Sequence, residues 1–350
     1  MGLLREVAYV NVLPRNIQFV LAGDIGGTNS NFGVCQIEKN KINLLLSIHI
    51  KSKEITDFPL IVNQVIHHLK SNYEIHISRA CFAAAGVVSE DNLYSKPTNL
   101  PFIIDAREII ARTDLEYAII INDFEAVGYG VDYISPESLI TINEGSSYDH
   151  ANRAIIGAGT GLGKGVLGWN DYSKKYIPIP SEGGHADFPV YTQQEFDLMS
   201  FIKNNIDPNF PVSWENVLSG GGIIRLYNYL GTKNQYQETE YTRKIKESGA
   251  NPDQIFKYWQ EDQRSAETYN CYSRFYARCA KNFALESLAL NGLYIAGGIA
   301  AKNLPLFQRP EFMAEFINCK KQQGVLENIP VKVIADYNVS LFGAAAFLKR

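Results

Sequence analysis

The feature that most constrains the fold is a strand–glycine turn–strand pattern that occurs twice along the chain. In the first unit two short apolar runs flank Gly26–Gly27, and in the second two apolar runs flank the glycine-rich residues 157–165. Glycine has no Cβ, so the backbone can turn tightly between two strands. We interpret the two units as a weak internal repeat, because they share a pattern rather than residue identities.

Apolar runs and helical patterns alternate along the rest of the chain. A helix is expected from Phe58 to Leu69, where apolar residues recur at helical spacing and Asp57 can cap the first turn. The polar residues 231–264 are expected to form a surface excursion with helical pieces. The other expected strands cover residues 17–22, 32–37, 41–50, 80–88, 117–121, 153–156, 166–169, 293–296 and 331–335, and the other expected helices cover residues 105–112, 192–204, 214–230, 253–290 and 340–348. This alternation predicts an α/β architecture.

Composition excludes several classes of protein. The 350 residues suggest two domains, and a hydrophobic content of 46% is that of a folded chain. The net charge of −4 argues against a nucleic-acid partner, and no apolar run reaches the ~18 residues of a membrane span. Five scattered cysteines without a CxxC pair indicate neither a disulfide framework nor a zinc site, so we expect a cytoplasmic protein.

The first glycine turn is a candidate phosphate loop. Its backbone N–H groups at Gly26 and Gly27 can face phosphate oxygens, and Thr28 and Asn29 add side-chain donors. Asp24, at the end of the preceding strand, could hold Mg²⁺ through water as a hard oxygen ligand. The alternative is a plain hairpin turn with no ligand.

Two further glycine turns follow strands. Residues 157–165 match neither a dinucleotide fingerprint nor a Walker loop, because no acidic residue and helix follow as expected and Lys164 is not followed by Ser or Thr. Gly297 and Gly298 come directly after the strand at 293–296. Each turn alone can be purely structural. Three such turns in one chain favour a polyphosphate ligand held between two domains.

The apolar strand that ends at Ile121 is followed by Asn122 and Asp123. Asp123 could be the N-cap of the next helix. It could instead place a carboxylate at the carboxyl ends of the strands, where ligands of α/β proteins bind. In that position Asp123 could accept a proton from a substrate hydroxyl.

Glu182, His185 and Glu215 are candidates for binding a small polar ligand. Two glycines separate Glu182 from His185, and this spacing lets both side chains converge. No cysteine or second histidine lies nearby, which argues against a metal site. The alternatives are a capped loop whose histidine bonds the backbone, and a helix start capped by Ser213 at which the Glu215 charge is favourable.

Taken together and in this order, DIGGTN, INDFEA, GAGTGLG, SEGGHADF, WENVLSGGG and YIAGGI resemble the bacterial-type ATP-dependent glucokinases. That family belongs to the sugar kinase, actin and heat-shock chaperone superfamily. The resemblance extends from about residue 17 to residue 347. The cysteine-rich zinc motif of the repressor-type sugar kinases is missing, which favours the non-zinc branch.

The resemblance implies a two-domain actin-like ATPase (ribonuclease H-like) fold of the α/β class with an interdomain cleft for ATP and sugar. The small α/β domain would comprise residues 1–133 and 337–350, and the large α/β domain residues 134–336. The implied reaction transfers the γ-phosphate of MgATP to the 6-hydroxyl of glucose. Members of this branch often form homodimers, so a homodimer is possible here.

The resemblance also assigns roles to individual residues. Asp123 would be the catalytic base. The substrate-binding residues would be Asn122, Asp123, Glu182, His185 and Glu215. The ATP-binding residues would be Asp24, Gly26, Gly27, Thr28, Asn29, Gly159, Thr160, Gly161, Gly297 and Gly298, with Asp24 also holding Mg²⁺. Thr98–Asn99 resembles a sugar-binding loop of the small domain.

Three features differ from the family pattern, and three rival functions remain. Asn31 stands where relatives often carry Arg, Lys164 lies in the second glycine loop, and residues 231–264 are longer than typical. The rivals are a kinase for another hexose such as mannose or fructose, a polyphosphate-using glucokinase, and a catalytically dead sugar-sensing regulator. The retained Asp123 argues against the regulator.

Overall fold

The computed structural model describes residues 5–10, 18–39, 41–97, 100–233 and 235–349, and the chain divides into two compact units. The first unit comprises residues 1–138, 170–180 and 336–350, and the second comprises residues 139–169 and 181–335. Residues 170–180 thus group with the first unit, whereas the resemblance places them in the large domain. The domain limits expected from the sequence stay a prediction.

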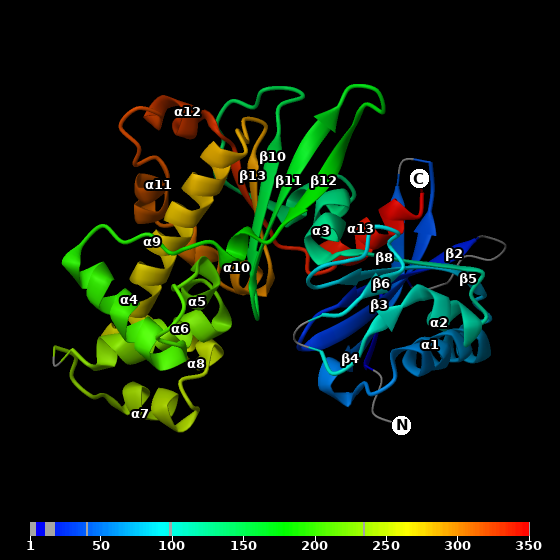
Figure 1. Ribbon diagram of the computed structural model, residues 1–350, viewed down its shortest axis with the longest axis horizontal. Helices are drawn as coiled ribbons and strands as arrows, with labels where there is room; N and C mark the ends of the chain where they lie inside the picture. Colours follow the sequence, from blue (N-terminus) through cyan, green and yellow to red (C-terminus); the bar gives the residue numbers. More distant parts are fainter. Residues whose placement is uncertain (1–4, 11–17, 40, 98–99, 234, 350) are drawn as a thin grey trace. The chain divides into compact units, whose positions relative to one another are not determined.

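The strands and helices follow one another in mixed α/β order, as the sequence predicts (Figure 1). The strands are β1 (Arg5–Ala8), β2 (Phe19–Ile25), β3 (Asn29–Ile37), β4 (Ile42–Lys51), β5 (Ile77–Ala84), β6 (Tyr94–Ser95), β7 (Ile104–Asp105), β8 (Tyr117–Asn122), β9 (Leu139–Asn143), β10 (Arg153–Ala158), β11 (Leu162–Asn170), β12 (Lys175–Ser181), β13 (Leu293–Ala296) and β14 (Val331–Ile334). The α-helices are α1 (Phe58–Tyr73), α2 (Ala106–Ala111), α3 (Asp123–Gly130), α4 (Gln193–Ile206), α5 (Trp214–Val217), α6 (Gly220–Gly231), α7 (Glu240–Glu247), α8 (Pro252–Lys257), α9 (Gln263–Glu286), α10 (Gly298–Lys302), α11 (Pro310–Phe316), α12 (Gln323–Asn328) and α13 (Val339–Phe347). The short 3-10 turns are η1 (Ser52–Glu54), η2 (Pro136–Ser138), η3 (Gly183–His185) and η4 (Leu304–Leu306).

The first unit is built on a sheet with the strand order β1-β4-β3-β2-β5-β8. Strand β2 pairs antiparallel with β3 and parallel with β5, and β5 pairs parallel with β8. Helices α1 and α2 cover one face of this sheet, and α3 and α13 cover the other (Figure 1). Since both faces are covered, the central strands are apolar on both sides.

The helix caps explain where the chain enters α1 and α2. The side chain of Asp57 accepts a hydrogen bond from the N–H of Leu60, so the predicted N-cap of α1 is confirmed. Asp105 caps α2 in the same way through the N–H of Arg107. Each cap satisfies one of the N–H groups that lack a partner in the first turn.

The second sheet has the order β12-β11-β10-β13-β14-β9, and apart from the edge strand β12 its strands belong to the second unit. Strand β10 pairs antiparallel with β11 and parallel with β13, as β2 does with β3 and β5 in the first sheet. The two glycine turns noted in the sequence therefore join equivalent strands, β2 to β3 and β10 to β11. The internal repeat suggested by the sequence pattern is confirmed at the level of topology.

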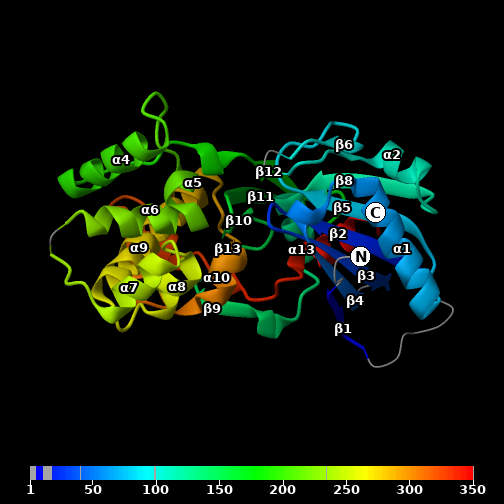
Figure 2. The same cartoon turned by 90° about the horizontal axis from the view of Figure 1, so that it is seen from below.

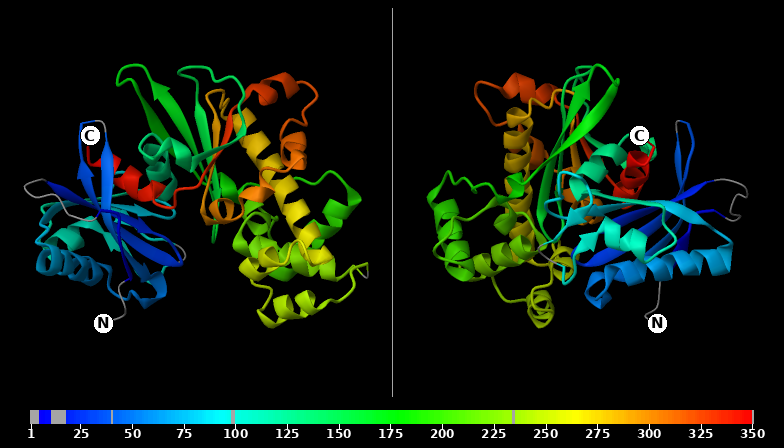
Figure 3. Two further views of the ribbon diagram at one scale, coloured as in Figure 1. Left: turned by 180° about the vertical axis from the view of Figure 1, so that it is seen from behind. Right: turned by 45° about the vertical axis from the view of Figure 1, so that its right-hand side comes forward.

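Most of the helices of the second unit gather around the long helix α9, which runs alongside the sheet (Figure 3). Figure 2 shows α7 and α8 next to one another, and α8 also contacts α6 and α9. Tyr276 of α9 is buried and donates its hydroxyl to the carbonyl of Ile156 at 3.3 Å. This bond ties α9 to the strand that leads into the second glycine turn.

Two helices that the sequence predicts as continuous are each divided. The expected helix 214–230 breaks after Val217, where Ser219 caps α6 through the N–H of Gly222 at 3.1 Å. The expected helix 253–290 breaks before α9, where Asp262 accepts from the N–H of Ser265 at 2.8 Å. In both cases a capping side chain starts a new helix within an apolar pattern that by itself favours continuation.

Several short strands were not predicted. Strand β1 pairs with β4, with Arg5 opposite His49, and β9 and β12 form the two edges of the second sheet. Edge strands mix polar and apolar residues, so they lack the continuous apolar signal of central strands. Among the described residues, no helix has the length and apolar character needed to cross a membrane.

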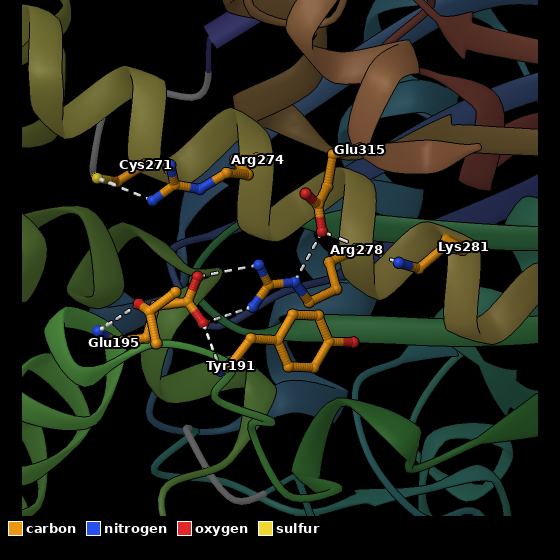
Figure 4. A network of polar contacts seen from close by, with 8 residues as sticks. Tyr191, Glu195, Cys271, Arg274, Arg278, Lys281 and Glu315 are labelled. Carbon is orange, nitrogen blue, oxygen red and sulfur yellow. Dashed lines mark hydrogen bonds and ion pairs between the residues drawn. The ribbon is translucent and has the colours of Figure 1, made fainter. Parts of the chain in front are cut away.

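A buried ion-pair network joins α4, α9 and α11 (Figure 4). Arg278 is 3% exposed and binds both carboxylate oxygens of Glu195 at 2.9 Å, while its Nε donates to Glu315 at 2.8 Å. The N–H of Tyr191 donates to Glu195 at 2.7 Å, and Lys281 lies 3.9 Å from Glu315. Although burial raises it, hydrogen bonds from Arg278 and the Tyr191 N–H hold the pKa of Glu195 below its ordinary value.

Candidate functional site

The first unit brings Asp24 and Asp123 to the same edge of its sheet. In the parallel register Asp24 lies opposite Ala83, and Ala83 lies opposite Ile121, two residues before Asp123. The carboxyl ends of β2, β5 and β8 therefore meet at one edge, where α/β proteins bind ligands. Two strand spacings of ~4.8 Å place the ends of β2 and β8 about 10 Å apart.

Asp24 is a half-buried carboxylate at the end of β2. Burial raises its pKa to about 6, although the hydrogen bond from Asn31 lowers it. Asn31 donates through Nδ2 at 3.5 Å. Among the described residues, no lysine or arginine forms an ion pair with Asp24, so its charge is not neutralised by the protein itself.

Asn31 is held in place by His49, which no motif in the sequence singles out. Its Oδ1 lies 2.7 Å from Nδ1 of His49, and Nε2 of His49 lies 2.8 Å from the hydroxyl of Ser47. Because an amide oxygen only accepts, His49 donates from Nδ1. Burial and the charge of Arg5 lower the pKa of His49, which favours this neutral form. The sequence offered no signal, since these residues lie on separate strands.

The first glycine turn is a tight connection between β2 and β3. The N–H of Gly26 donates to the carbonyl of Asn29 at 3.0 Å, and the buried Ser52 donates its hydroxyl to the carbonyl of Gly26 at 2.6 Å. The N–H of Ser52 also donates to the carbonyl of Thr28 at 3.1 Å. Ser52 therefore fixes the shape of the turn, a role that the sequence did not predict.

Asn122, rather than Asp123, is the N-cap of α3. Its Oδ1 accepts from the N–H groups of Phe124 and Glu125 at 2.9 and 3.2 Å, and its Nδ2 donates to the carbonyl of Gly86 at 3.0 Å. The alternative that Asp123 caps the helix is therefore wrong. Asp123 is the first residue of α3 and accepts from the N–H of Phe124 at 2.9 Å.

In the second unit, the turn at residues 159–161 lies beside the turn at Gly297. Strands β10 and β13 run parallel, with Gly157 opposite Ala296. Gly297 has a φ of +90°, and a Cβ at this position would overlap the carbonyl oxygen of Ala158. Only glycine meets both demands without strain, so the two predicted nucleotide turns adjoin at one sheet edge.

Glu215, at the start of α5, contacts the second glycine turn. Its Oε2 accepts from the N–H of Leu162 at 3.0 Å. The N–H of Gly220, at the start of α6, donates to the carbonyl of Gly159 at 2.9 Å. Ser213 caps α5, as the sequence predicts. The motif WENVLSGGG therefore contacts the second glycine turn at two points, the start of α5 and the start of α6. Gly220 was not among the site residues predicted from the sequence.

Glu182 directly precedes the turn η3, and His185 is the last residue of that turn. The turn lies next to strand β11. Nε2 of His185 lies 3.8 Å from Oε2 of Glu182, and both side chains are more than half exposed, at 61% and 58%. A Cβ on Gly184 would overlap the carbonyl oxygen of Leu162, so this turn packs directly on β11. The side chains of Glu182 and His185 therefore lie close together, whereas their binding of one ligand stays a prediction.

Lys164 packs against the turn η3, because a Cβ on Gly183 would lie 3.1 Å from the Cδ of Lys164. Its side chain is buried, at 3% exposed, and its Nζ lies 5.2 Å from the ring centroid of Phe283 on α9. Lys164 therefore points to the helix-covered face of the sheet and does not extend the second glycine turn as a phosphate ligand. Thr98–Asn99, the remaining predicted sugar loop, lies outside the described residues.

Comparison with known proteins identifies the family. The family model described as Glucokinase matches residues 21–350. The chain belongs to the glucokinase family. A curated relative, the glucokinase of Trichormus variabilis, is 34% identical over an alignment that covers 93% of this chain and 97% of the relative.

Solved structures of other glucokinases have the same fold. A glucokinase from an Antarctic psychrotroph matches with a TM-score of 0.77 and 26% identity, covering 95% of this chain and 99% of that chain. A ROK family glucokinase from Streptomyces griseus, solved in complex with glucose and AMPPNP, matches with a TM-score of 0.66 and 17% identity, covering 94% and 98%. The actin-like ATPase fold expected from the glucokinase resemblance is confirmed.

Proposed function

We propose that this glucokinase-family protein transfers the γ-phosphate of ATP to the 6-hydroxyl of glucose, giving glucose 6-phosphate and ADP. The observation that carries the proposal is the shared sheet edge of Asp24 and Asp123, in a chain whose family is that of the glucokinases. One carboxylate would serve the nucleotide and the other the sugar. Asn122, Asp123, Glu182, His185 and Glu215 would bind glucose together.

In the proposed reaction Asp123 accepts the proton of the 6-hydroxyl and orients its oxygen for in-line attack. Phosphoryl transfer leaves little covalent work to the protein, so catalysis depends on positioning and charge stabilisation. The helix position of Asp123 supports this role, because its backbone is fixed by the cap at Asn122. Asn122 itself has one N–H left for the sugar, since the other binds Gly86.

ATP would be held by Asp24, Gly26, Gly27, Thr28, Asn29, Gly159, Thr160, Gly161, Gly297 and Gly298. Mg²⁺ commonly binds proteins through one or two carboxylates plus substrate phosphates and keeps several waters. Asp24 fits such a role, because it is a hard oxygen donor with only the Asn31 amide as its hydrogen-bond partner among the described residues. When bound, Mg²⁺ supplies charge neutralisation at the phosphates.

We further propose that the protein belongs to the non-zinc branch of the sugar kinase, actin and heat-shock chaperone superfamily. Its functional domains would be residues 1–133 with 337–350, and residues 134–336. A cytoplasmic location and a homodimer complete the proposal. The cysteines, all free among the described residues, agree with a reducing compartment.

Replacing Glu182 by alanine is expected to raise the glucose KM by about 10- to 100-fold. A hydrogen bond to a charged group contributes about 1.5–3 kcal/mol, and the loss leaves a sugar hydroxyl unpaired. Glu261→Ala, which removes an exposed carboxylate outside the site, is the matched control and should leave KM unchanged. Steady-state kinetics with varied glucose measures both. An unchanged KM in the Glu182 variant would remove this residue from the sugar site.

The raised pKa of Asp24 predicts an acid limb in the pH profile. Asp24 is ionised above pH 6 and becomes protonated as the pH falls, so kcat/KM for MgATP should drop about tenfold for each pH unit below 6. Asn31→Leu removes the hydrogen bond that lowers this pKa, so the limb should move to higher pH. A flat profile between pH 7 and pH 5 would contradict the assignment of Asp24.

A coupled assay of ADP formation tests the function itself. The purified protein is offered ATP or polyphosphate together with glucose, mannose, fructose or no sugar. We expect ADP to form with ATP and glucose, with little turnover in the absence of sugar. Equal or greater turnover of mannose or fructose would make the protein a kinase for another hexose, and no turnover of any sugar would favour a sugar-sensing regulator.

A further inference from the structure

The polar residues 231–264, which the proposed function does not use, form part of a cavity in the second unit. The cavity has a volume of about 500 Å³ and is lined by residues of α6, α7 and the first turn of α9, and by the segments that follow α6 and α7. Three cationic side chains, Lys233, Lys246 and Arg264, line it together with a single carboxylate, Glu238. The wall therefore carries an excess of positive charge.

The guanidinium of Arg264 is held rigidly in this wall. Its Cζ lies 3.7 Å from the ring centroid of Tyr227, and its Nε donates to the carbonyl of Tyr227 at 2.7 Å. On the other side a Cβ at Gly231 would overlap the guanidinium, so the group is packed against the backbone of Gly231. A guanidinium fixed in this way loses little further entropy when it binds an anion.

The structure leaves the two Nη groups of Arg264 without an acceptor among the described residues. The nearest acidic neighbour in the sequence, Asp262, is 1% exposed and accepts from the Thr242 and Thr239 hydroxyls at 2.6 and 3.1 Å and from the Ser265 N–H. Asp262 is therefore committed to capping α9 and tying it to α7. The fork of Arg264 matches the bidentate geometry that phosphate oxygens accept.

We propose that this cavity is a binding site for a dianionic phosphate group, either free or carried by a small metabolite. Arg264 binds two phosphate oxygens, and Lys233 and Lys246 supply the remaining positive charge. Within the second unit, the site is separate from the glycine turn at residues 159–161. Helix α6 has its first residue, Gly220, at the turn of Gly159 and its last, Gly231, in the cavity wall, and it is about 18 Å long.

Isothermal titration calorimetry of the full chain tests the proposal, with inorganic phosphate, glycerol 3-phosphate and uncharged glycerol as probes. We expect wild-type protein to bind the two phosphates but not glycerol. Arg264→Gln should weaken phosphate binding at least tenfold, and Gly231→Ala should do the same because its methyl group displaces the guanidinium. Lys257→Gln, which removes an exposed cation outside the cavity wall, is the matched control and should bind as wild type does.

The variants must keep glucose phosphorylation and the wild-type circular dichroism spectrum. Lys246→Gln, at an exposed position, adds a variant that does not disturb packing and should weaken binding several-fold. Phosphate bound at the nucleotide turns would not respond to these substitutions. Only the phosphate binding that is lost in Arg264→Gln is therefore assigned to the cavity. Absence of binding in the wild type, or unchanged binding in all three cavity variants, would overturn the proposal.

Discussion

Asp123→Asn is expected to lower kcat by about 10²- to 10⁴-fold while the protein still binds glucose. The amide has nearly the shape of the carboxylate and can still accept from the N–H of Phe124, so the start of α3 is preserved. Loss of the negative charge in the first helical turn costs only about 0.3–1 kcal/mol of stability. The lost function is proton acceptance from the sugar hydroxyl.

Glu125→Gln is the matched control for this prediction. Glu125 also lies in the first turn of α3 and carries the same charge, but the proposal gives it no role in the reaction. We expect its kcat to stay close to the wild-type value. Single-turnover kinetics together with glucose binding by calorimetry separates chemistry from binding. Near-normal turnover in the Asp123 variant would refute the assignment of the base.

Arg278→Met is expected to lower the free energy of unfolding by about 3–5 kcal/mol. The substitution leaves the buried Glu195 and the partly buried Glu315 without their shared cation. Removing one partner of a buried ion pair costs more than the pair contributes, because the remaining charge stays desolvated. Urea unfolding followed by circular dichroism measures the change.

Arg112→Met provides the comparison at the surface. Arg112 also binds two carboxylates, those of Asp57 and Glu108 at 2.6 and 2.9 Å, but its side chain is 39% exposed. Solvent screens such pairs, so the loss of stability should be much smaller than that in Arg278→Met. Equal effects in the two variants would show that the buried network has no special role in stability.

The Arg278 effect should depend on pH in a defined direction. The pKa of Glu195 is lower in the folded protein than its ordinary value of 4.5, so its stabilising contribution is present above pH 4.5 and is lost as the pH falls through the folded-state pKa. The difference between wild type and Arg278→Met should therefore shrink below pH 4.5. The triple variant with Glu195→Gln and Glu315→Gln should recover part of the lost stability.

The sequence predicted the central strands of both sheets and the two equivalent glycine turns, because buried strands and glycine turns have strong local signals. It also predicted that Asp57 and Ser213 cap their helices, and both predictions are confirmed. It could not place the edge strand β1, whose residues are held by pairing with β4 rather than by an apolar pattern. Helix breaks before α6 and α9 were missed because capping side chains lie inside otherwise helical patterns.

In the candidate site, too, the sequence predicted only what depends on residues close to one another in the chain. Glu182 and His185 are close in sequence, and their pairing was predictable from the spacing. Ser52 and His49 were missed, because each acts through a residue on another strand or turn, and only the fold brings them together. Lys164 lies in the glycine-rich stretch of the sequence, but in the structure it belongs to strand β11 and its side chain is buried.

The central claim is that the Asp123 carboxylate receives the proton of the sugar hydroxyl that attacks ATP. A crystal structure of the protein with glucose and a non-hydrolysable ATP analogue tests it most directly. We expect one Asp123 oxygen within about 2.6–3.2 Å of the glucose 6-oxygen. A complex in which another carboxylate occupies that place, with Asp123 turned away from the sugar, would contradict it.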